Sequence, residues 1–182
     1  MIASTRRMAA MADRAGAAAQ ELDRLAPRID LEDRMPPEAL GLLWDRGFMT
    51  MLVPREHGGG GASGLEALIA VVELAKGCGS AALLVTLQAL SVHAIAEFGG
   101  KRARDWFGKM VDGRASFAFA LSEPEPLEGK ELMVTTAKKA GASFVLRGRK
   151  AMVTGARDAD VAIAFAVTNP RSGLRKAISA FV

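Results

Sequence analysis

Histidine and cysteine, which often act in catalysis or bind metals, are scarce in this 182-residue sequence. Its two histidines lie in different surroundings, because His57 is in a glycine-rich loop and His93 is expected to face the interior from an apolar helix. Neither has a serine or cysteine partner at a spacing typical of nucleophilic catalysis, so both are interpreted as structural. With Cys78 as its single cysteine, the sequence offers neither a disulfide framework nor a typical zinc site, and no metal is expected.

Two clusters invite a functional interpretation. The glycine run Gly58–Gly61 stands between two expected helices and has no lysine after it, whereas a phosphate-binding loop follows a strand and carries Gly-Lys-Ser/Thr. A tight turn is therefore predicted. Four glutamates are expected in a proline-rich exposed loop, where no burial would shift their pKa values. These are predicted to be solvated rather than an acid and base pair: Glu123, Glu125, Glu128 and Glu131.

Composition excludes several classes of protein. Half of the residues are hydrophobic and the charges have mixed sign, which excludes a disordered chain. The net charge of +4 comes from residues 115–182 and is interleaved with acids, so no nucleic-acid partner is expected. The apolar stretch Ala81–Ala96 is interrupted by polar residues and is expected to be a buried helix, not a membrane span. Because Asp13 and Arg14 interrupt the N-terminal apolar run, no signal peptide is expected and the predicted location is cytoplasmic.

The elements that would position these residues change character near residue 114. Before it, apolar residues recur at three-and-four spacing, which indicates helices. Pro27 is expected to end the first helix, and Ser63 with Glu66 forms a capping box for the third. The five predicted helices cover residues 4–26, 36–47, 63–76, 81–97 and 101–111.

After residue 114 the apolar period falls to two, and turn residues separate short runs. Six strands are predicted, at residues 115–121, 132–140, 143–147, 150–154, 161–167 and 177–182. The expected fold class is α+β. An N-terminal all-helical bundle domain over residues 1–114 would be followed by an incomplete antiparallel β domain over residues 115–182.

Short segments along nearly the whole chain resemble, in the correct order, the motifs of the acyl-CoA dehydrogenase family. The segment Phe119–Pro124, F-A-L-S-E-P, is similar to the family's F-A-L-T-E-P, and Val145–Thr154 is similar to V-L-N-G-x-K-x-W-I-T. The other matching segments are Gly47–Gly61, Glu97–Phe107, Asp112–Arg114, Thr135–Ala137, Ala159-Asp160 and Lys176–Val182.

The resemblance implies a flavoprotein that removes hydrogen from the α,β bond of an acyl thioester, with FAD as cofactor and a role in fatty acid metabolism. A glutamate base takes the α proton, and the β hydrogen leaves as hydride to the flavin. Carried over by position, Phe119, Leu121 and Ser122 would touch the flavin ring. Met152 stands where the family has a tryptophan that stacks on the flavin, and Thr154 would bind near its reactive nitrogen.

The same resemblance assigns the acyl-tail pocket to Ala81, Ala82, Val85 and Ala89. The family's G-S-D segment, which approaches the FAD pyrophosphate and the thioester arm, falls on Leu127-Glu128-Gly129. Glu128 would there lie close to the phosphates and repel them.

The family's catalytic glutamate lies in a C-terminal helical domain beyond the stretch matched here, so no catalytic residue is expected in this chain. The substrate would be an acyl thioester on CoA or on a carrier protein. The chain is expected to be the truncated first half of the enzyme, inactive by itself, and to work as a homo-oligomer or with a complementary chain. Two alternatives stay open, a non-catalytic binding or assembly module with a decayed flavin site and a flavin monooxygenase on the same fold.

Overall fold

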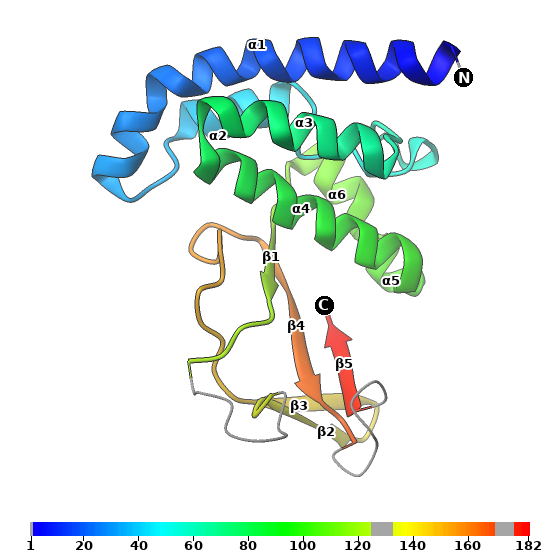
Figure 1. The fold of residues 1–182 in the computed structure, drawn as a ribbon. Coiled ribbons are helices and arrows are strands. Elements are labelled where there is room, and N and C mark those ends of the chain that lie inside the picture. The colour runs from blue at the N-terminus through cyan, green and yellow to red at the C-terminus, as the bar shows by residue number, and fades with distance from the viewer. Residues whose placement is uncertain (1, 125–132, 170–176) are drawn as a thin grey trace. The chain divides into compact units, whose positions relative to one another are not determined.

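The computed structural model describes residues 2–124, 133–169 and 177–182. It divides the chain into two compact units, a helical unit of Met1–Ser116 and a β unit of Phe117–Val182 (Figure 1). The sequence prediction placed this change after Arg114. The fold class is α+β, as predicted.

The helical unit is built around three long helices. Helix α1 packs along α3, and α3 packs against α4. The fully buried side chains include Leu22 of α1, Leu43 of α2, Leu74 of α3 and Val85 of α4. The helices are α1 (Ile2–Glu32), α2 (Pro37–Asp45), η1 (Arg55–His57), α3 (Gly64–Gly77), α4 (Gly79–Phe98), α5 (Lys101–Arg104) and α6 (Trp106–Gly113).

The first helix is longer than predicted, because Pro27 lies inside it. A proline lacks the N–H donor and clashes with the preceding turn, so it usually ends or kinks a helix. Here the helix beyond it is held by burial in the core, by an ion pair within α1 and by an ion pair with α2. Ile29 is 4% exposed within the core, and Arg28 pairs with Glu32 at 2.8 Å and also with Glu38. The prediction that Pro27 ends the helix was wrong, and α1 instead bends near its C-terminal end (Figure 1).

Helix α4 is the one described helix whose length and composition would allow it to cross a membrane. Those two properties are shared by the central helices of globular cores. Ala81, Ala82 and Val85 of α4 belong to the hydrophobic core of the helical unit. One side of α4 is therefore buried as predicted, whereas Leu83 and Leu90 on the rest of its surface are exposed.

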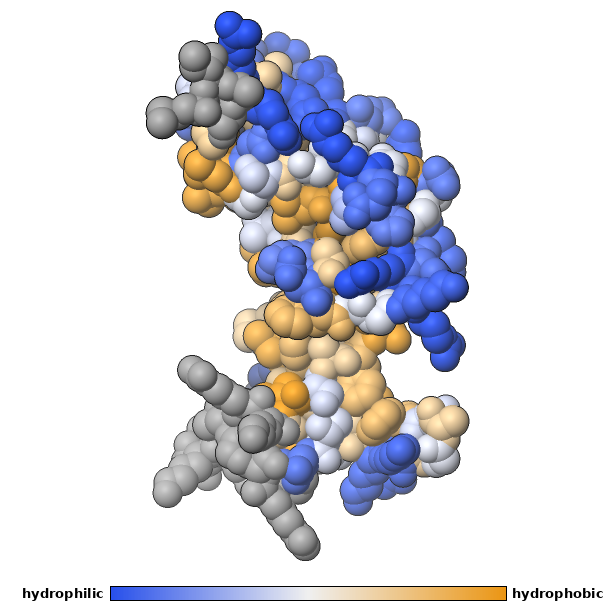
Figure 2. Space-filling model, turned by 90° about the vertical axis from the view of Figure 1, so that its right-hand side faces the viewer, coloured by the Kyte–Doolittle hydropathy of each residue, from blue (hydrophilic) through white to orange (hydrophobic). Residues whose placement is uncertain are grey.

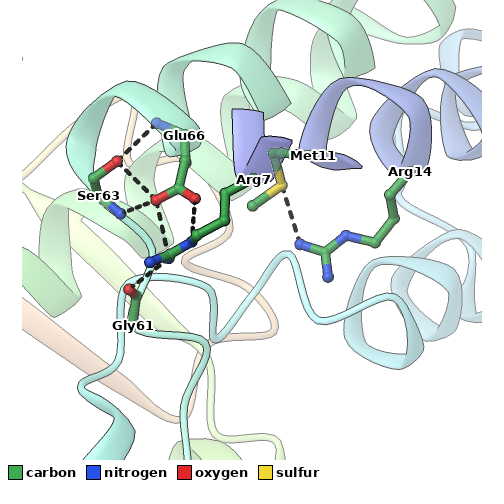
Figure 3. Close-up of polar contacts among 6 residues, drawn as sticks. All are labelled: Arg7, Met11, Arg14, Gly61, Ser63 and Glu66. Atoms are coloured by element: carbon green, nitrogen blue, oxygen red, sulfur yellow. Dashed lines mark hydrogen bonds and ion pairs between the residues drawn. The ribbon is translucent and has the colours of Figure 1, made fainter. Parts of the chain in front are cut away.

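The start of α3 confirms the predicted capping box (Figure 3). The Ser63 Oγ accepts a hydrogen bond from the Glu66 amide at 3.3 Å, and the Ser63 amide donates to Glu66 Oε2 at 2.7 Å. Arg7 of α1 adds a two-pronged contact, with Nε 2.7 Å from Glu66 Oε1 and Nη2 3.1 Å from Oε2. The same Nη2 donates to the Gly61 carbonyl at 3.2 Å. Hydrogen bonds from Ser63, with the charge of Arg7, lower the pKa of Glu66 although the carboxylate is buried. The box therefore also fastens α1 to the glycine loop.

Ser63→Ala is expected to destabilise the helical unit by about 1 kcal/mol, the usual cost of losing an N-cap side chain. Both tryptophans, Trp44 and Trp106, lie in this unit, so their fluorescence during urea unfolding measures its stability. Ser63→Thr, which keeps both the N-cap acceptor and the hydroxyl that donates to Glu66 Oε2 at 2.8 Å, serves as the control. An unchanged unfolding midpoint in Ser63→Ala would mean that the box contributes nothing.

The β unit contains one five-stranded sheet. Its order is β1-β4-β2-β3, and β5 pairs with β4. Much of the visible surface of this unit is apolar (Figure 2), and β3 is exposed along its whole length. The strands are β1 (Phe117–Ala120), β2 (Thr136–Ala140), β3 (Ser143–Arg147), β4 (Val161–Val167) and β5 (Ile178–Phe181).

The sheet is mixed, whereas an antiparallel one was predicted. The β2–β3 and β4–β5 pairs are antiparallel, but β1 and β2 both run parallel to β4. The chain leaves β1, forms the β2–β3 hairpin and returns, so that Phe117 pairs with Val161 and Ala120 with Ala164 in the same direction. Alternation of apolar residues reports which face is buried but not which way a strand runs, which is why the direction was missed.

Residues 150–154 do not form the sixth predicted strand. Met152 has φ of 52°, in the left-handed region, and the backbone turns there instead of extending. A non-glycine residue in this region is uncommon and is held there by its surroundings.

Candidate functional site

A buried ion pair joins the segment after β1 to the segment after β3. The Lys150 ammonium donates to Glu123 Oε1 at 2.9 Å and to the Leu121 carbonyl at 3.1 Å. The side chain of Glu123 is 4% exposed and that of Lys150 is 12% exposed. One ammonium therefore connects a side chain and a backbone carbonyl of the same short segment.

The Glu123 carboxylate also holds the chain that leads into β2. Its Oε2 accepts from the Val134 amide at 2.6 Å, and its Oε1 accepts from the Thr135 amide at 2.9 Å. Thr135 packs against Gly148. A Cβ atom at position 148 would be 2.3 Å from Thr135 Oγ1, so only glycine fits there without a shift. Three segments that are far apart in sequence thus meet at one carboxylate.

Burial is the largest influence on the pKa of Glu123 and raises it, but the hydrogen bonds from Lys150 and from the amides of Val134 and Thr135 together lower it to about 2. The carboxylate is therefore charged at neutral pH. A general base works best with a pKa near the operating pH, so Glu123 is unsuited to that role. The prediction that Glu123 is a solvated loop residue was wrong. The other three glutamates of that cluster, Glu125, Glu128 and Glu131, lie outside the described residues.

Exposed apolar side chains stand beside this ion pair. The Ala151 amide donates to the Ser122 carbonyl at 2.9 Å, which lays residues 121–122 against residues 150–152. Leu121 is 48% exposed and Met152 is 86% exposed, and Ser122 is exposed with them. Three of the residues assigned to the flavin thus come together on paired segments.

The other two residues assigned to the flavin are placed nearby in the same unit. Phe119 is half-buried on β1, with its ring 5.0 Å from the ring of Phe165 on β4. Thr154 is half-buried in the turn that follows Met152. Contact of any of these residues with a flavin stays a prediction.

The residues assigned to the acyl tail lie in the helical unit. Ala81, Ala82 and Val85 are buried in its core, and Ala89 is half-buried against that core. Their side chains contact neighbouring helices, and their contact with substrate stays a prediction. Glu128, the remaining substrate assignment, lies outside the described residues.

A cavity of about 500 Å³ lies beside the ion pair in the β unit. Its walls are small or apolar side chains, among them Ala118, Ala120 and Val153, and its polar lining comes from Lys150 and Asp160. The sequence did not predict this cavity. Lys150 and Val153, which line the cavity, flank Ala151 and Met152 in the sequence, so the cavity and the exposed Met152 side chain share the segment that Lys150 anchors.

Neither histidine belongs to this cluster. His57 is exposed, as a loop position suggests, and its ring lies 5.1 Å from the ring of Phe107. His93 is exposed rather than buried, because it occupies the outer side of α4, while Val92 and Ile95 are buried. The expectation that His93 faces the interior was wrong. Over the described part of the chain, no group of three or more His, Cys, Asp or Glu side chains could hold a metal ion.

The sequence model for the acyl-CoA dehydrogenase N-terminal domain matches residues 5–114. The chain belongs to the acyl-CoA dehydrogenase family. The short-chain specific acyl-CoA dehydrogenase of Bos taurus is 35% identical over 167 residues, which cover 91% of this chain and 40% of the bovine protein. The structure of butyryl-CoA dehydrogenase from Megasphaera elsdenii matches with a TM-score of 0.80 and 25% identity, over 96% of this chain and 47% of that one. The chain therefore spans less than half the length of these relatives.

These matches confirm the family resemblance and the fold of a helical domain followed by a β domain. Acyl-CoA dehydrogenases of this family are FAD-dependent flavoproteins and act on CH–CH bonds. One matching structure, a glutaryl-CoA dehydrogenase from Mycobacterium smegmatis in complex with FADH2, has a TM-score of 0.76 and 26% identity over 94% of this chain and 44% of that one.

The described residues suit the ring of such a cofactor. A flavin ring is flat and apolar on its faces and has hydrogen-bonding atoms at its edge. Leu121 and Met152 offer adjacent exposed apolar surface, and the exposed hydroxyl of Ser122 can donate to or accept from an edge atom. The segment Leu127–Gly129, which would face the pyrophosphate, lies outside the described residues.

The sequence interpretation missed the Glu123–Lys150 pair. Both residues stand inside the motifs that carried the resemblance, Glu123 in F-A-L-S-E-P and Lys150 in the segment Val145–Thr154. The available signal was that one of these motifs contains a carboxylate, Glu123, and the other contains a cation, Lys150. Only the folded chain shows that the two meet.

Proposed function

We propose that this chain binds the flavin ring of FAD, as part of an acyl-CoA dehydrogenase-like enzyme, through Phe119, Leu121, Ser122, Met152 and Thr154. The reaction would be α,β-dehydrogenation of an acyl thioester on CoA or on a carrier protein. The observation that supports this most is the pair of exposed apolar side chains, Leu121 and Met152, on segments joined by a buried ion pair. The proposal includes a cytoplasmic location and a homo-oligomer or a complementary chain as partner.

The residues of this chain would bind and orient rather than move the proton. When bound, FAD supplies the hydride acceptor. Ser122 would hydrogen-bond the edge of the ring, and Leu121 and Met152 would exclude water from its face. Since the pKa of Glu123 is about 2, that carboxylate would not take the α proton.

One observation favours a second candidate, a binding or assembly module whose flavin site has decayed. Met152 stands at the position of the stacking tryptophan and is 86% exposed. Methionine is flexible and covers a ring less completely than an indole does. A module of this kind would keep the fold and lose affinity for the flavin.

Titration of the purified chain with FAD, followed by flavin fluorescence and visible absorbance, separates the two candidates. Saturable binding is expected for the natural sequence. Met152→Trp is expected to tighten it on the order of tenfold, because stacking of aromatic rings contributes about 1.4 kcal/mol. Phe144→Trp on the exposed strand β3 controls for non-specific stacking and should change nothing.

The outcomes distinguish the candidates. Binding that appears only in Met152→Trp would favour the decayed site over the flavoenzyme. A chain that stays colourless and binds no FAD in either form would contradict flavin binding by these residues.

A further inference from the structure

Lys150 and Glu123 are within two positions in the sequence of Leu121, Ser122 and Met152, the residues that would receive the flavin on the paired segments. Glu123 follows Ser122 directly, and a single residue, Ala151, separates Lys150 from Met152. The Lys150 ammonium bonds both the Glu123 carboxylate and the Leu121 carbonyl. Between these contacts, the Ala151 amide donates to the Ser122 carbonyl at 2.9 Å. The two segments are therefore tied at three points within a few residues.

The ion pair specifies how residues 121–123 align with residues 150–152, which apolar packing alone would not do. Burying two charges carries a large desolvation cost, and packed apolar side chains of similar volume often stabilise a fold equally well. An ammonium that bonds both a carboxylate and a carbonyl of one segment loses hydrogen bonds when the segments slip, so it favours the observed register. Glu123 extends that constraint to the amides of Val134 and Thr135.

The backbone conformation of Met152 is one feature that these contacts hold in place. Its φ of 52° lies in the left-handed region, which is unfavourable for a residue with a Cβ atom. Such a conformation persists when surrounding contacts over-determine it. The anchored neighbours Lys150 and Ala151 supply contacts of this kind, and the side chain of Met152 is turned outward and 86% exposed.

We infer that Glu123 and Lys150 form a positioning pair, which holds Leu121, Ser122 and Met152 in the arrangement that receives the flavin ring without touching the ring itself. This inference rests on the proposed function for the identity of the ligand. It adds the residues that set the geometry of the site. The pair acts through the backbone of its neighbours, so its removal should change how the flavin is held as well as how tightly the unit folds.

The test compares Lys150→Met with Lys139→Met, which removes the same charge from an exposed position on β2. FAD titration, the visible absorbance of bound flavin and its fluorescence anisotropy are measured at a temperature where each variant is folded. Lys150→Met is expected to lose at least tenfold in affinity and to change the absorbance band and the anisotropy of bound flavin. Lys139→Met is expected to behave like the natural chain. Lys150→Arg, which keeps the charge but moves the donors, should recover part of the affinity with a displaced spectrum.

Hydrogen exchange at the Ala151 amide separates failure of this inference from failure of the proposed function. In the chain without flavin, Lys150→Met is expected to expose this amide on the order of tenfold more often, while Lys139→Met leaves it protected. If the natural chain binds no FAD but the amide responds in this way, the proposed function fails and the positioning role stands.

Two results would overturn the positioning pair. One is a folded Lys150→Met that holds FAD with natural affinity and an unchanged spectrum. The other is an Ala151 amide that stays equally protected in that variant. If Lys150→Met does not fold, Lys150→Gln, which removes the charge and keeps a polar end group, carries the same test, and natural affinity with a natural spectrum in that folded variant would overturn the inference as well.

Discussion

Gly77→Ala is expected to destabilise the helical unit by about 2 to 3 kcal/mol, although alanine is the better helix former. A Cβ atom at this position would lie 2.0 Å from the Ala19 carbonyl oxygen and 2.7 Å from its carbonyl carbon. Both atoms belong to the backbone of α1, so no side-chain rotation can relieve the clash. The methyl group would force α1 away from α3, and these two helices form the most extensive packing in the unit.

Urea unfolding followed by the fluorescence of Trp44 and Trp106 measures this loss, because both tryptophans lie in the helical unit. Gly41→Ala in α2 is the matched control. A Cβ atom there meets no described atom within 4 Å, and the substitution is expected to raise stability by up to about 1 kcal/mol. Equal midpoints for Gly77→Ala and the natural chain would contradict the close approach of α1 to α3.

Most of the helical unit could be predicted because its signals are local. Apolar spacing identified α2, α3 and α4, and the Ser63-x-x-Glu66 pattern gave the start of α3 within one residue of where it lies. Pro27 failed as a signal because the opposing effect is not local. The burial of Ile29 and the pairing of Arg28 with Glu38, on another helix, hold α1 together beyond the proline.

The site was less predictable, since its central contact joins residues far apart in sequence. Seen locally, Glu123 precedes a proline in a loop, which suggests solvent exposure. Its carboxylate is bonded by Lys150 and by the amides of Val134 and Thr135, which lie 11 to 27 residues further along the chain. The same contact turns residues 150–154 away from the strand that their composition suggests. The family motifs identified these residues in their order along the chain, but a sequence motif does not show which residues are in contact.

Acidification is expected to destabilise the β unit through Glu123, with a loss on the order of 2 kcal/mol between about pH 4.5 and about pH 2. In the folded chain the pKa of this carboxylate is lowered to about 2. In the unfolded chain it is close to the ordinary value of about 4.3. As the pH falls, the unfolded chain takes up the proton first, and this favours unfolding. The contribution of Glu123 is therefore complete above about pH 4.5 and is lost as the pH approaches the folded pKa.

Glu123→Gln isolates this contribution. At neutral pH it is expected to cost about 3 kcal/mol, because it leaves the Lys150 ammonium buried without a counter-charge. Urea unfolding at several pH values, followed through the NMR signals of the Val134 and Thr135 amides, reports on the segment that Glu123 binds. Asp158→Asn, at an exposed position in the same unit, should keep the acid sensitivity of the natural chain. An acid transition in Glu123→Gln as steep as the natural one would assign the sensitivity to other carboxylates. A flattened transition would instead assign the acid sensitivity of the β unit to this one carboxylate.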